Sequence, residues 1–248
     1  MRWTMVIAVC GALILAGCSK SEMRSEVTDK YPTGAKKKEN YFMVVGAKKD
    51  VVRTVYYFAD GSIQSDTHYS KGKPDSVMIG NYPNGKRFIE TAYKDGKKNG
   101  KDMSWYEDGK LKSEAAYALD TPLGTATAYF PDGKKSSEMS FKNGKKDGVE
   151  TVWYANEKKK RMTTYAAGNK NGLEQEWYEN GNLKDEQTYA NDVLSGPSTE
   201  YYENGKKETE MTYKDGALDG TKTMWTENGK KQGEATYKDG NMVEGKSF

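Results

Sequence analysis

An aromatic side chain returns every 24 residues along most of this chain. The positions that hold it are Tyr69, Tyr93, Tyr117, Phe141, Tyr165, Tyr189, Tyr213 and Tyr237. Half a period away, a second aromatic register runs through Trp105, Tyr129, Trp153, Trp177, Tyr201 and Trp225. A third register consists of glycines, namely Gly100, Gly124, Gly148, Gly172, Gly196 and Gly220. Three registers that keep one spacing predict a repeat protein, in which each unit packs mainly against its neighbours.

The composition restricts how such repeats can fold. Of the 248 residues, 35% are hydrophobic and 30% are charged, while 18 residues are tyrosines. A chain this polar cannot fill a thick two-layer core, and a chain this rich in aromatic side chains is not expected to be disordered. We therefore expect a fold that is thin, elongated and repetitive.

The first residues have the pattern of an export signal. Arg2 gives a short basic start, and the apolar stretch 5–15 is too short to be expected to span a bilayer. The segment 15–18, Leu-Ala-Gly-Cys, follows directly. It resembles the bacterial lipoprotein signal, in which small residues precede a lipid-modified cysteine. The resemblance implies that residues 1–17 are removed and that Cys18 anchors the protein to a bacterial membrane, with the folded part outside the cytoplasm.

The residue after the cysteine bears on which membrane this would be. Ser19, which is not an aspartate, is compatible with the outer membrane if the cell is Gram-negative. The alternative is a plain secretory signal or an N-terminal anchor.

Cysteine and charge content narrow the chemistry further. The two cysteines are Cys10, inside the signal, and Cys18, so none is left for a disulfide, a metal ion or a nucleophile. Residues 1–17 contain one arginine and no acid, so their removal lowers the formal net charge from +3 to +2. That near-balance gives no electrostatic reason to expect a nucleic-acid partner.

Two segments separate the lipid site from the repeats. Residues 18–39 are polar and lack apolar periodicity, which predicts a flexible tether. Residues 40–55 lie in the most β-branched part of the chain, where the stretches 41–45 and 51–58 predict a hairpin that caps the array. The repeats then occupy 56–248, in about eight units.

Each unit reads as a hairpin with a characteristic loop. In the unit 101–124, we expect strands at 101–106 and 110–117 and a longer connection over 118–124. Equivalent loops are Pro-Asn-Gly, Pro-Asp-Gly and Glu-Asn-Gly. A proline cannot take a positive φ, which excludes a type I′ turn that begins there. The loops are therefore expected to be a type I turn followed by a left-handed glycine, three residues in all.

That loop length predicts the register of the hairpin. Tyr106 would pair with Lys110, Trp105 with Leu111, and Met103 with Ser113. Because strand side chains alternate, one face would hold both long aromatic registers and the other a mixture of tyrosine, lysine and glutamate. In this unit the expected members are Trp105, Leu111, Ala115 and Tyr117 on the first face, and Tyr106, Lys112 and Glu114 on the second.

The repeat unit W-Y-x-D/N-G-K-x-x-x-E-x-x-Y-x-x-G-x-x-x-G carries a family resemblance. It resembles the MORN-like repeat variant found in proteins grouped as YwqK-family antitoxin components, over residues 56–245. The resemblance implies an all-β fold, an array of antiparallel β-hairpins that form a single twisted sheet. It implies little chemistry, because such repeats occur in proteins with many different partners. Glu157 replaces the usual turn glycine, so we expect a local irregularity there.

Catalysis finds little support. His68, the only histidine, occupies a strand position that elsewhere holds alanine, serine or threonine, with no nucleophile nearby. The sequence has no zinc spacing, phosphate loop or dinucleotide fingerprint, so neither a metal nor a cofactor is expected. An acidic register is better explained by cross-strand charge pairs than by an active site, since every repeat has it. Its members are Asp66, Glu90, Glu114, Glu138, Glu186, Glu210 and Glu234.

The aromatic and glycine registers receive different roles. One set is expected to hold hairpin to hairpin: Trp105, Tyr117, Trp153, Trp177, Trp225, Gly100, Gly124 and Gly148. A single-layer sheet cannot bury both faces, so aromatic residues of the second face form a candidate binding surface. These are Tyr82, Tyr106, Phe130, Tyr154, Tyr178 and Tyr202. The alternative is that they only brace neighbouring strands.

We therefore expect a non-enzymatic, membrane-anchored lipoprotein of the cell envelope that acts as a repeat scaffold and binds another macromolecule, in first place a protein. Two alternatives stay open. One is an antitoxin or immunity role, in which the protein neutralises a toxin by binding it. The other is binding of an envelope glycan, because aromatic and polar ladders can stack on sugar rings.

Overall fold

The computed structural model describes residues 21–247, and every regular element in that part of the chain is a β-strand. The chain divides into two compact units, whose described parts are 21–121 and 122–247. The predicted signal peptide and Cys18 lie outside the described residues.

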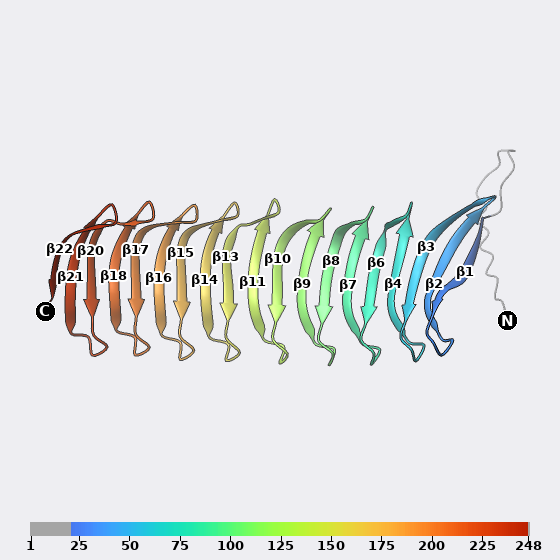
Figure 1. Ribbon diagram of the computed structural model, residues 1–248, viewed down its shortest axis with the longest axis horizontal. Helices are drawn as coiled ribbons and strands as arrows, with labels where there is room; N and C mark the ends of the chain where they lie inside the picture. The colour runs from blue at the N-terminus through green and yellow to red at the C-terminus, as the bar shows by residue number, and fades with distance from the viewer. Residues whose placement is uncertain (1–20, 248) are drawn as a thin grey trace. The chain divides into compact units, whose positions relative to one another are not determined.

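In the first unit, consecutive strands pair antiparallel, and Figure 1 shows them running alternately up and down. The strands are β1 (Ser21–Lys30), β2 (Lys36–Val45), β3 (Lys48–Tyr57), β4 (Ile63–Ser70), β5 (Lys73–Pro74), β6 (Ser76–Asn81), β7 (Arg87–Lys94), β8 (Lys97–Trp105) and β9 (Leu111–Ala118).

The second unit repeats this pattern (Figure 1). Its strands are β10 (Thr121–Tyr129), which begins at the boundary, β11 (Lys135–Lys142), β12 (Lys145–Lys146), β13 (Gly148–Trp153), β14 (Lys159–Ala166), β15 (Asn169–Trp177), β16 (Leu183–Ala190), β17 (Val193–Tyr201), β18 (Lys207–Lys214), β19 (Ala217–Leu218), β20 (Gly220–Trp225), β21 (Lys231–Lys238) and β22 (Asn241–Ser247). The prediction of an all-β array of antiparallel hairpins is confirmed.

The N-terminal part of the described chain differs from the expected tether. Residues 21–30 form β1, which pairs antiparallel with β2, so the polar stretch is a strand over much of 18–39. Eight of its ten side chains are polar or charged and most are exposed, so the strand lacks the apolar alternation by which strands are recognised. The expected hairpin is present as β2 and β3, with longer strands than predicted and a tight turn at 46–47.

The three-residue loops have the predicted geometry. The amide of Tyr106 donates to the carbonyl oxygen of Lys110 at 2.8 Å, and Gly109, at φ 91°, donates back to Tyr106 at 2.9 Å. The loop that contains Glu157 makes the same two hydrogen bonds, from Tyr154 to Lys158 and from Glu157 to Tyr154. The irregularity expected there is therefore wrong. Glu157 instead adopts the left-handed conformation, at φ 69°, that glycine takes in the other repeats.

The second connection of each unit is shorter than predicted. The expected long link over 118–124 does not exist, because β9 ends at Ala118 and β10 begins at Thr121. The two residues between them lie at φ 49° and 69°, and Asn191 and Asp192 repeat this pair of values. Two central residues with positive φ form a type I′ turn, whose twist matches that of the flanking strands.

A bulge in each hairpin corrects the predicted faces. Trp105 pairs with Leu111, as expected, but Ser104 pairs with Ser113, so Lys112 is an extra residue. Met103 therefore lies opposite Glu114 and not opposite Ser113. Strand alternation then puts Glu114 on the face of Trp105, and Tyr117 on the opposite face, which also carries Tyr106 and Lys112. The two long aromatic registers occupy different faces, and the predicted arrangement is wrong.

The same pairing explains why the glycine register exists. Each of these glycines faces the aromatic residue seventeen positions later, as in Gly172 and Tyr189 or Gly196 and Tyr213. Gly172 has φ 117°, a conformation that side chains rarely adopt, and an added Cβ would lie 3.3 Å from the side chain of Thr164. Two of the sequence registers are thus the two halves of one cross-strand pair.

The core is thin in both units. In the first unit the buried apolar side chains are Phe42 and Val55, and in the second they are Met139 and Met211. Several buried residues are polar, among them Thr91, Thr163 and Glu174. Stability must therefore come largely from the backbone ladder and from side-chain pairs across strands.

Candidate binding faces

The outer tyrosines of the predicted binding face are tied to the next repeat. The hydroxyl of Tyr178 donates to the carbonyl oxygen of Tyr201 at 2.8 Å, and three further repeats make the same bond, whereas Phe130 has no hydroxyl to donate. The other donors and acceptors are Tyr82 to Trp105, Tyr154 to Trp177 and Tyr202 to Trp225. These rings are half-buried. They stitch one hairpin to the next, which is the bracing role, and their part in binding stays a prediction.

The loop asparagines add a second stitch. Asn180 accepts a hydrogen bond from the amide of Asn182 within its own loop, and its side-chain amide donates to the carbonyl oxygen of Glu203 at 2.9 Å. Asn156 and Asn204 bridge to the following loop in the same way. The preference for asparagine in these loops therefore has a tertiary cause, which the turn pattern alone does not reveal.

We call the side of the second unit that carries Tyr178, Asp185, Gln187 and Tyr189 the tyrosine face. A polar network fills its centre. Lys170 contacts Glu174 at 2.7 Å, and Thr163 donates to the same carboxylate at 2.7 Å. The Nζ atom of Lys170 also lies 4.6 Å from the centre of the Tyr189 ring. Burial alone would lower the pKa of Lys170, but its hydrogen bond and its attraction to Glu174 together raise that pKa.

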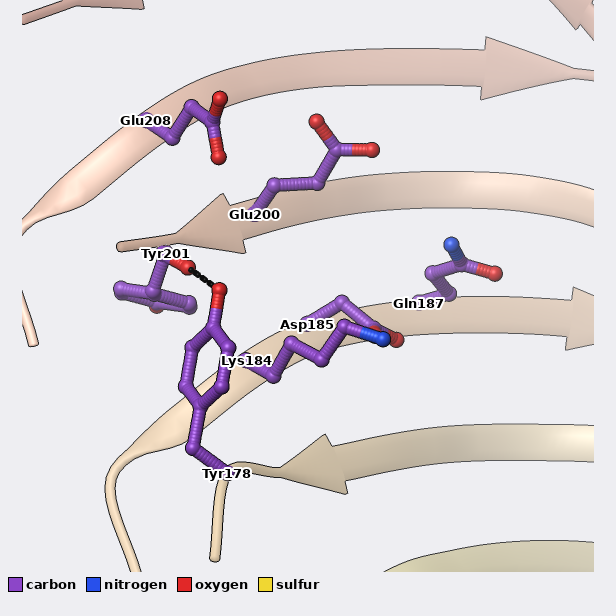
Figure 2. Close-up of a pocket in the computed structure, with 7 residues that line it drawn as sticks. All are labelled: Tyr178, Lys184, Asp185, Gln187, Glu200, Tyr201 and Glu208. Atoms are coloured by element: carbon purple, nitrogen blue, oxygen red, sulfur yellow. Dashed lines mark hydrogen bonds between the residues drawn. The ribbon is translucent and has the colours of Figure 1, made fainter. Parts of the chain in front are cut away.

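A hollow of about 210 Å³ opens on the tyrosine face, and Figure 2 shows its lining. The residues around it are Tyr178, Lys184, Asp185, Gln187, Glu200, Tyr201 and Glu208. Tyr178 crosses the hollow to reach the backbone of Tyr201, while the carboxylates of Glu200 and Glu208 lie on neighbouring strands (Figure 2).

Three acids stand side by side in a row that crosses this hollow. Glu176 on β15 pairs with Asp185 on β16, and Asp185 pairs with Glu200 on β17. Lys184 turns to Glu176, at 3.4 Å, and Glu200 accepts a hydrogen bond from Thr209 at 2.5 Å. Among the described residues, none donates a hydrogen bond to Asp185. Burial, and then repulsion from Glu176, raise the pKa of Asp185 to about 6.

This acidic row was missed at the level of sequence, although a signal for it exists. The equivalent pair is Ser104 and Ser113 in the first unit, joined by a 2.7 Å hydrogen bond, and Ala128 and Ser137 one repeat later. Glu176 and Asp185 differ from every other repeat in placing acids at both positions of the pair, and like charges directly opposite each other destabilise a sheet.

The opposite side of the second unit, which we call the tryptophan face, carries Trp153, Trp177, Tyr201 and Trp225. These residues lie on β13, β15, β17 and β20, with one strand between each pair of neighbours. A lysine from the intervening strand approaches the ring in two cases: Lys159 Nζ lies 5.7 Å from the centre of Trp177, and Lys207 Nζ lies 5.9 Å from Trp225. Such contacts are cation–π interactions.

The tryptophan face is also partly apolar and open. Four residues before Trp153 and Trp177, and on the same side of their strands, Val149 is 43% exposed and Leu173 is 40% exposed. The indole N–H groups of Trp153, Trp177 and Trp225 have no protein acceptor among the described residues, and none of them is sealed from solvent. Their donors are therefore available to a ligand.

Glutamates of the acidic register share this face, as the bulge requires. Lys207 contacts Glu210 at 2.7 Å, Lys231 contacts Glu234 at 2.6 Å, and Lys135 contacts Glu138. The expected cross-strand charge pairs are therefore wrong for these three acids, since each pair lies within a single strand at a spacing of three residues. Asp66 does form the expected kind of pair, with Arg53 of the neighbouring strand.

Other predicted positions are less informative. His68 is half-exposed, and its Nδ1 atom lies 4.0 Å from Asp66, which is held by Arg53 at 2.5 Å. Within residues 21–247, no cluster of acids, histidines or cysteines has the arrangement to hold a metal ion. The same part of the chain contains no helix long and apolar enough to span a membrane.

Comparison with known proteins supports the repeat assignment. Five stretches match the MORN repeat variant, at residues 98–118, 122–143, 170–191, 194–215 and 218–239. No curated protein matches the chain in sequence.

Similar solved structures include a crystal structure of TcdB2-TccC3-Cdc42, at 10% identity and a TM-score of 0.19 over 88% of this chain. Another is the Tc holotoxin pore of Photorhabdus luminescens, at 11% identity and a TM-score of 0.17 over 87% of this chain. The matches span only 16% and 13% of those chains, and TM-scores this low carry no argument about fold or function. The matched stretches show that residues 98–239 contain MORN-type repeats, and the same hairpin pattern runs through the rest of the described residues.

Proposed function

We propose that this protein is a non-enzymatic repeat scaffold, anchored to a bacterial membrane through a lipid on Cys18, that binds another macromolecule, in first place a protein. The observation that carries the binding role is the tryptophan face of the second unit. It carries an aromatic ring on every second strand, with lysine–glutamate pairs on β11, β18 and β21, beside the exposed Val149 and Leu173. The rings themselves are half-buried, and aromatic rings beside exposed apolar side chains are typical of interaction surfaces.

The tyrosine face is the less suitable surface. Its outer hydroxyls already bind backbone carbonyl oxygens, and its centre is filled by the network of Lys170, Glu174 and Thr163. Ligand binding there would have to compete with hydrogen bonds that hold the repeats together. This reverses the preference that the sequence suggested.

Capture from envelope extract tests the binding role. The bait is the chain with Cys18→Ser, and the matched bait carries the additional changes Trp153→Ser and Trp177→Ser. We expect the first bait to retain a partner that the second loses. Equal capture by both baits would refute the role of the tryptophan face, and a retained partner that is a toxin would assign the antitoxin role.

Membrane fractionation tests the anchor separately. Cys18→Ser is expected to move the protein from the membrane fraction to the soluble fraction, because a lipid chain attached at this position would be lost. Retention in the membrane fraction would refute the lipid anchor and would leave the binding role unaffected.

A further inference from the structure

We propose that the tryptophan face of the second unit binds a proline-rich segment of a partner protein in the polyproline II conformation. This inference rests on the proposed scaffold function and names the class of its ligand. It is argued from the spacing of the aromatic rings, from their unused donors, and from the balance of charge around them.

The rings form a column at a fixed interval. Trp153, Trp177, Tyr201 and Trp225 lie on strands that alternate with β14, β16 and β18. Neighbouring strands lie about 4.7–4.9 Å apart, so successive rings are spaced by about 9.4–9.8 Å. A ligand that contacts all of them must present a contacting group at that interval along its own length.

The interval selects one peptide conformation. A polyproline II helix advances about 9.3 Å in three residues, one full turn, so every third residue returns to the same side. Over the three intervals from Trp153 to Trp225 the mismatch sums to about 0.3–1.5 Å. An α-helix advances about 10.8 Å in two turns, and its mismatch over the same distance is about 3–4 Å. An extended strand, at about 6.6–6.8 Å for two residues, falls out of step at the first interval.

The hydrogen-bonding groups fit the same ligand. A sheet face offers side chains and no free backbone groups, so a ligand that needs backbone pairing would not be satisfied there. Within residues 21–247, the indole N–H groups of Trp153, Trp177 and Trp225 have no acceptor. A polyproline II segment has no internal hydrogen bonds, and its proline residues bring carbonyl acceptors without N–H donors. Aromatic rings that line a binding surface are the usual partners of such segments.

Charge on this face is balanced, which fits a neutral segment. The lysines opposite or beside the aromatic column are Lys135, Lys159, Lys207 and Lys231, and the glutamates of the next row are Glu138, Glu186, Glu210 and Glu234. Three of the lysines pair with glutamate, while Glu186 accepts from Gln175 at 2.5 Å and Lys159 lies near Trp177. A strongly acidic or basic segment would gain no net attraction from four charges of each sign.

The test measures binding of labelled peptides to the full-length chain by fluorescence anisotropy. The probes are a peptide of twelve prolines, a peptide of six prolines and a twelve-residue Gly-Ser peptide. The longest probe covers about 37 Å and reaches all four rings, whereas six prolines reach two. We expect saturable binding of the twelve-proline peptide, at least tenfold weaker binding of the six-proline peptide, and no binding of the Gly-Ser peptide.

Variants separate the tryptophan face from the rest of the sheet. Trp177→Phe keeps an aromatic ring but removes the donor, so the affinity should fall about three- to tenfold. Trp177→Tyr copies the residue found at position 201 and guards against loss of folding, with a smaller decrease expected. Lys184→Ala, on the tyrosine face, is the matched control and should leave affinity unchanged. The circular dichroism spectrum of each variant should match that of the parent.

The outcomes are distinct. Absence of saturable polyproline binding, equal affinity for the two proline peptides, or an unchanged affinity of Trp177→Phe would overturn the proposal. Binding of a β-1,4-linked N-acetylglucosamine hexamer without polyproline binding would also overturn it, and would leave the scaffold function standing with a glycan as ligand. Failure of the scaffold function itself would appear in the capture experiment, as the absence of any partner whose capture depends on Trp153 and Trp177.

Discussion

Asp185 should make the protein less stable at neutral pH than at mildly acidic pH. Its carboxyl faces Glu176 and Glu174 from β15 and Glu200 from β17, with Lys184 as the nearby cation on its own strand. Burial and these neighbouring acids raise its pKa from the ordinary value of 3.8 to about 6. A carboxyl with a raised pKa in the folded state binds more protons than the unfolded chain does between these two values. Stability therefore falls as the pH rises from about 3.8 to about 6, and stays lowered above that.

The size of the effect follows from the shift. A change of about two pKa units corresponds to about 3 kcal/mol between the two protonation states. Asp185 is half-buried, so solvent screens part of the repulsion, and we reduce the figure to about 1–1.5 kcal/mol. Asp185→Asn keeps the shape and removes the charge. It should raise the free energy of unfolding by about 1–1.5 kcal/mol at pH 7.5 and leave it nearly unchanged at pH 4.

Urea denaturation followed by circular dichroism, at several pH values from 4 to 7.5, measures this difference. Glu179→Gln, an exposed acid in the loop of the same repeat, is the matched control and should change stability little at any of these pH values. The reasoning is refuted if Asp185→Asn is no more stable than the parent at pH 7.5, or if its gain is the same at pH 4.

Three further changes test the backbone and the stitches between repeats, each by urea denaturation. Gly172→Ala places a side chain at φ 117° and 3.3 Å from Thr164, and should cost about 1–3 kcal/mol; a neutral result would contradict the backbone strain assigned to this position. Glu157→Gly relieves a left-handed glutamate and should stabilise by about 1 kcal/mol, although it removes an exposed ion pair with Lys134; destabilisation would show that this pair outweighs the backbone strain. Asn180→Asp keeps the hydrogen-bond acceptor of its own loop but removes the donor to Glu203, and should lower the free energy of unfolding by about 0.5–1.5 kcal/mol. If the bridge to Glu203 is the cause, Asn228→Asp should not reproduce this loss.

The sequence carried enough information for the fold class and for the main loop. The three-residue loops follow from proline and glycine chemistry that acts within five residues, and the observed hydrogen bonds of Tyr106 and Gly109 match it. The bulge at Lys112 was not predictable in the same way, because no residue type at that position marks an extra residue in a strand. Because the prediction did not include Lys112 as an extra residue, it placed Tyr117 on the wrong face of the sheet.

The roles of the two candidate faces depend on side-chain contacts that the 24-residue spacing of the sequence does not reveal. Tyr178 and its equivalents would recur in the sequence whether they bind a partner or a backbone carbonyl. Only the structure shows that their hydroxyls donate to backbone carbonyl oxygens. β1 was missed because both of its faces are largely exposed, so it shows no apolar alternation. The acidic row at Asp185 needed the cross-strand pairing, since its members are nine and fifteen residues apart in the chain.

The pairing of each glycine with an aromatic residue seventeen positions later also determines which insertions and deletions the fold can accept. Loss or duplication of 24 residues would return every ring, loop and bulge to an equivalent neighbour, while loss of a single residue inside a strand would turn half a hairpin over. Each added repeat would lengthen the row of tryptophans by one more interval without disturbing the others. If the tryptophan face binds a segment as proposed, whole-repeat recombination would change the length of ligand that it contacts without altering the individual contacts.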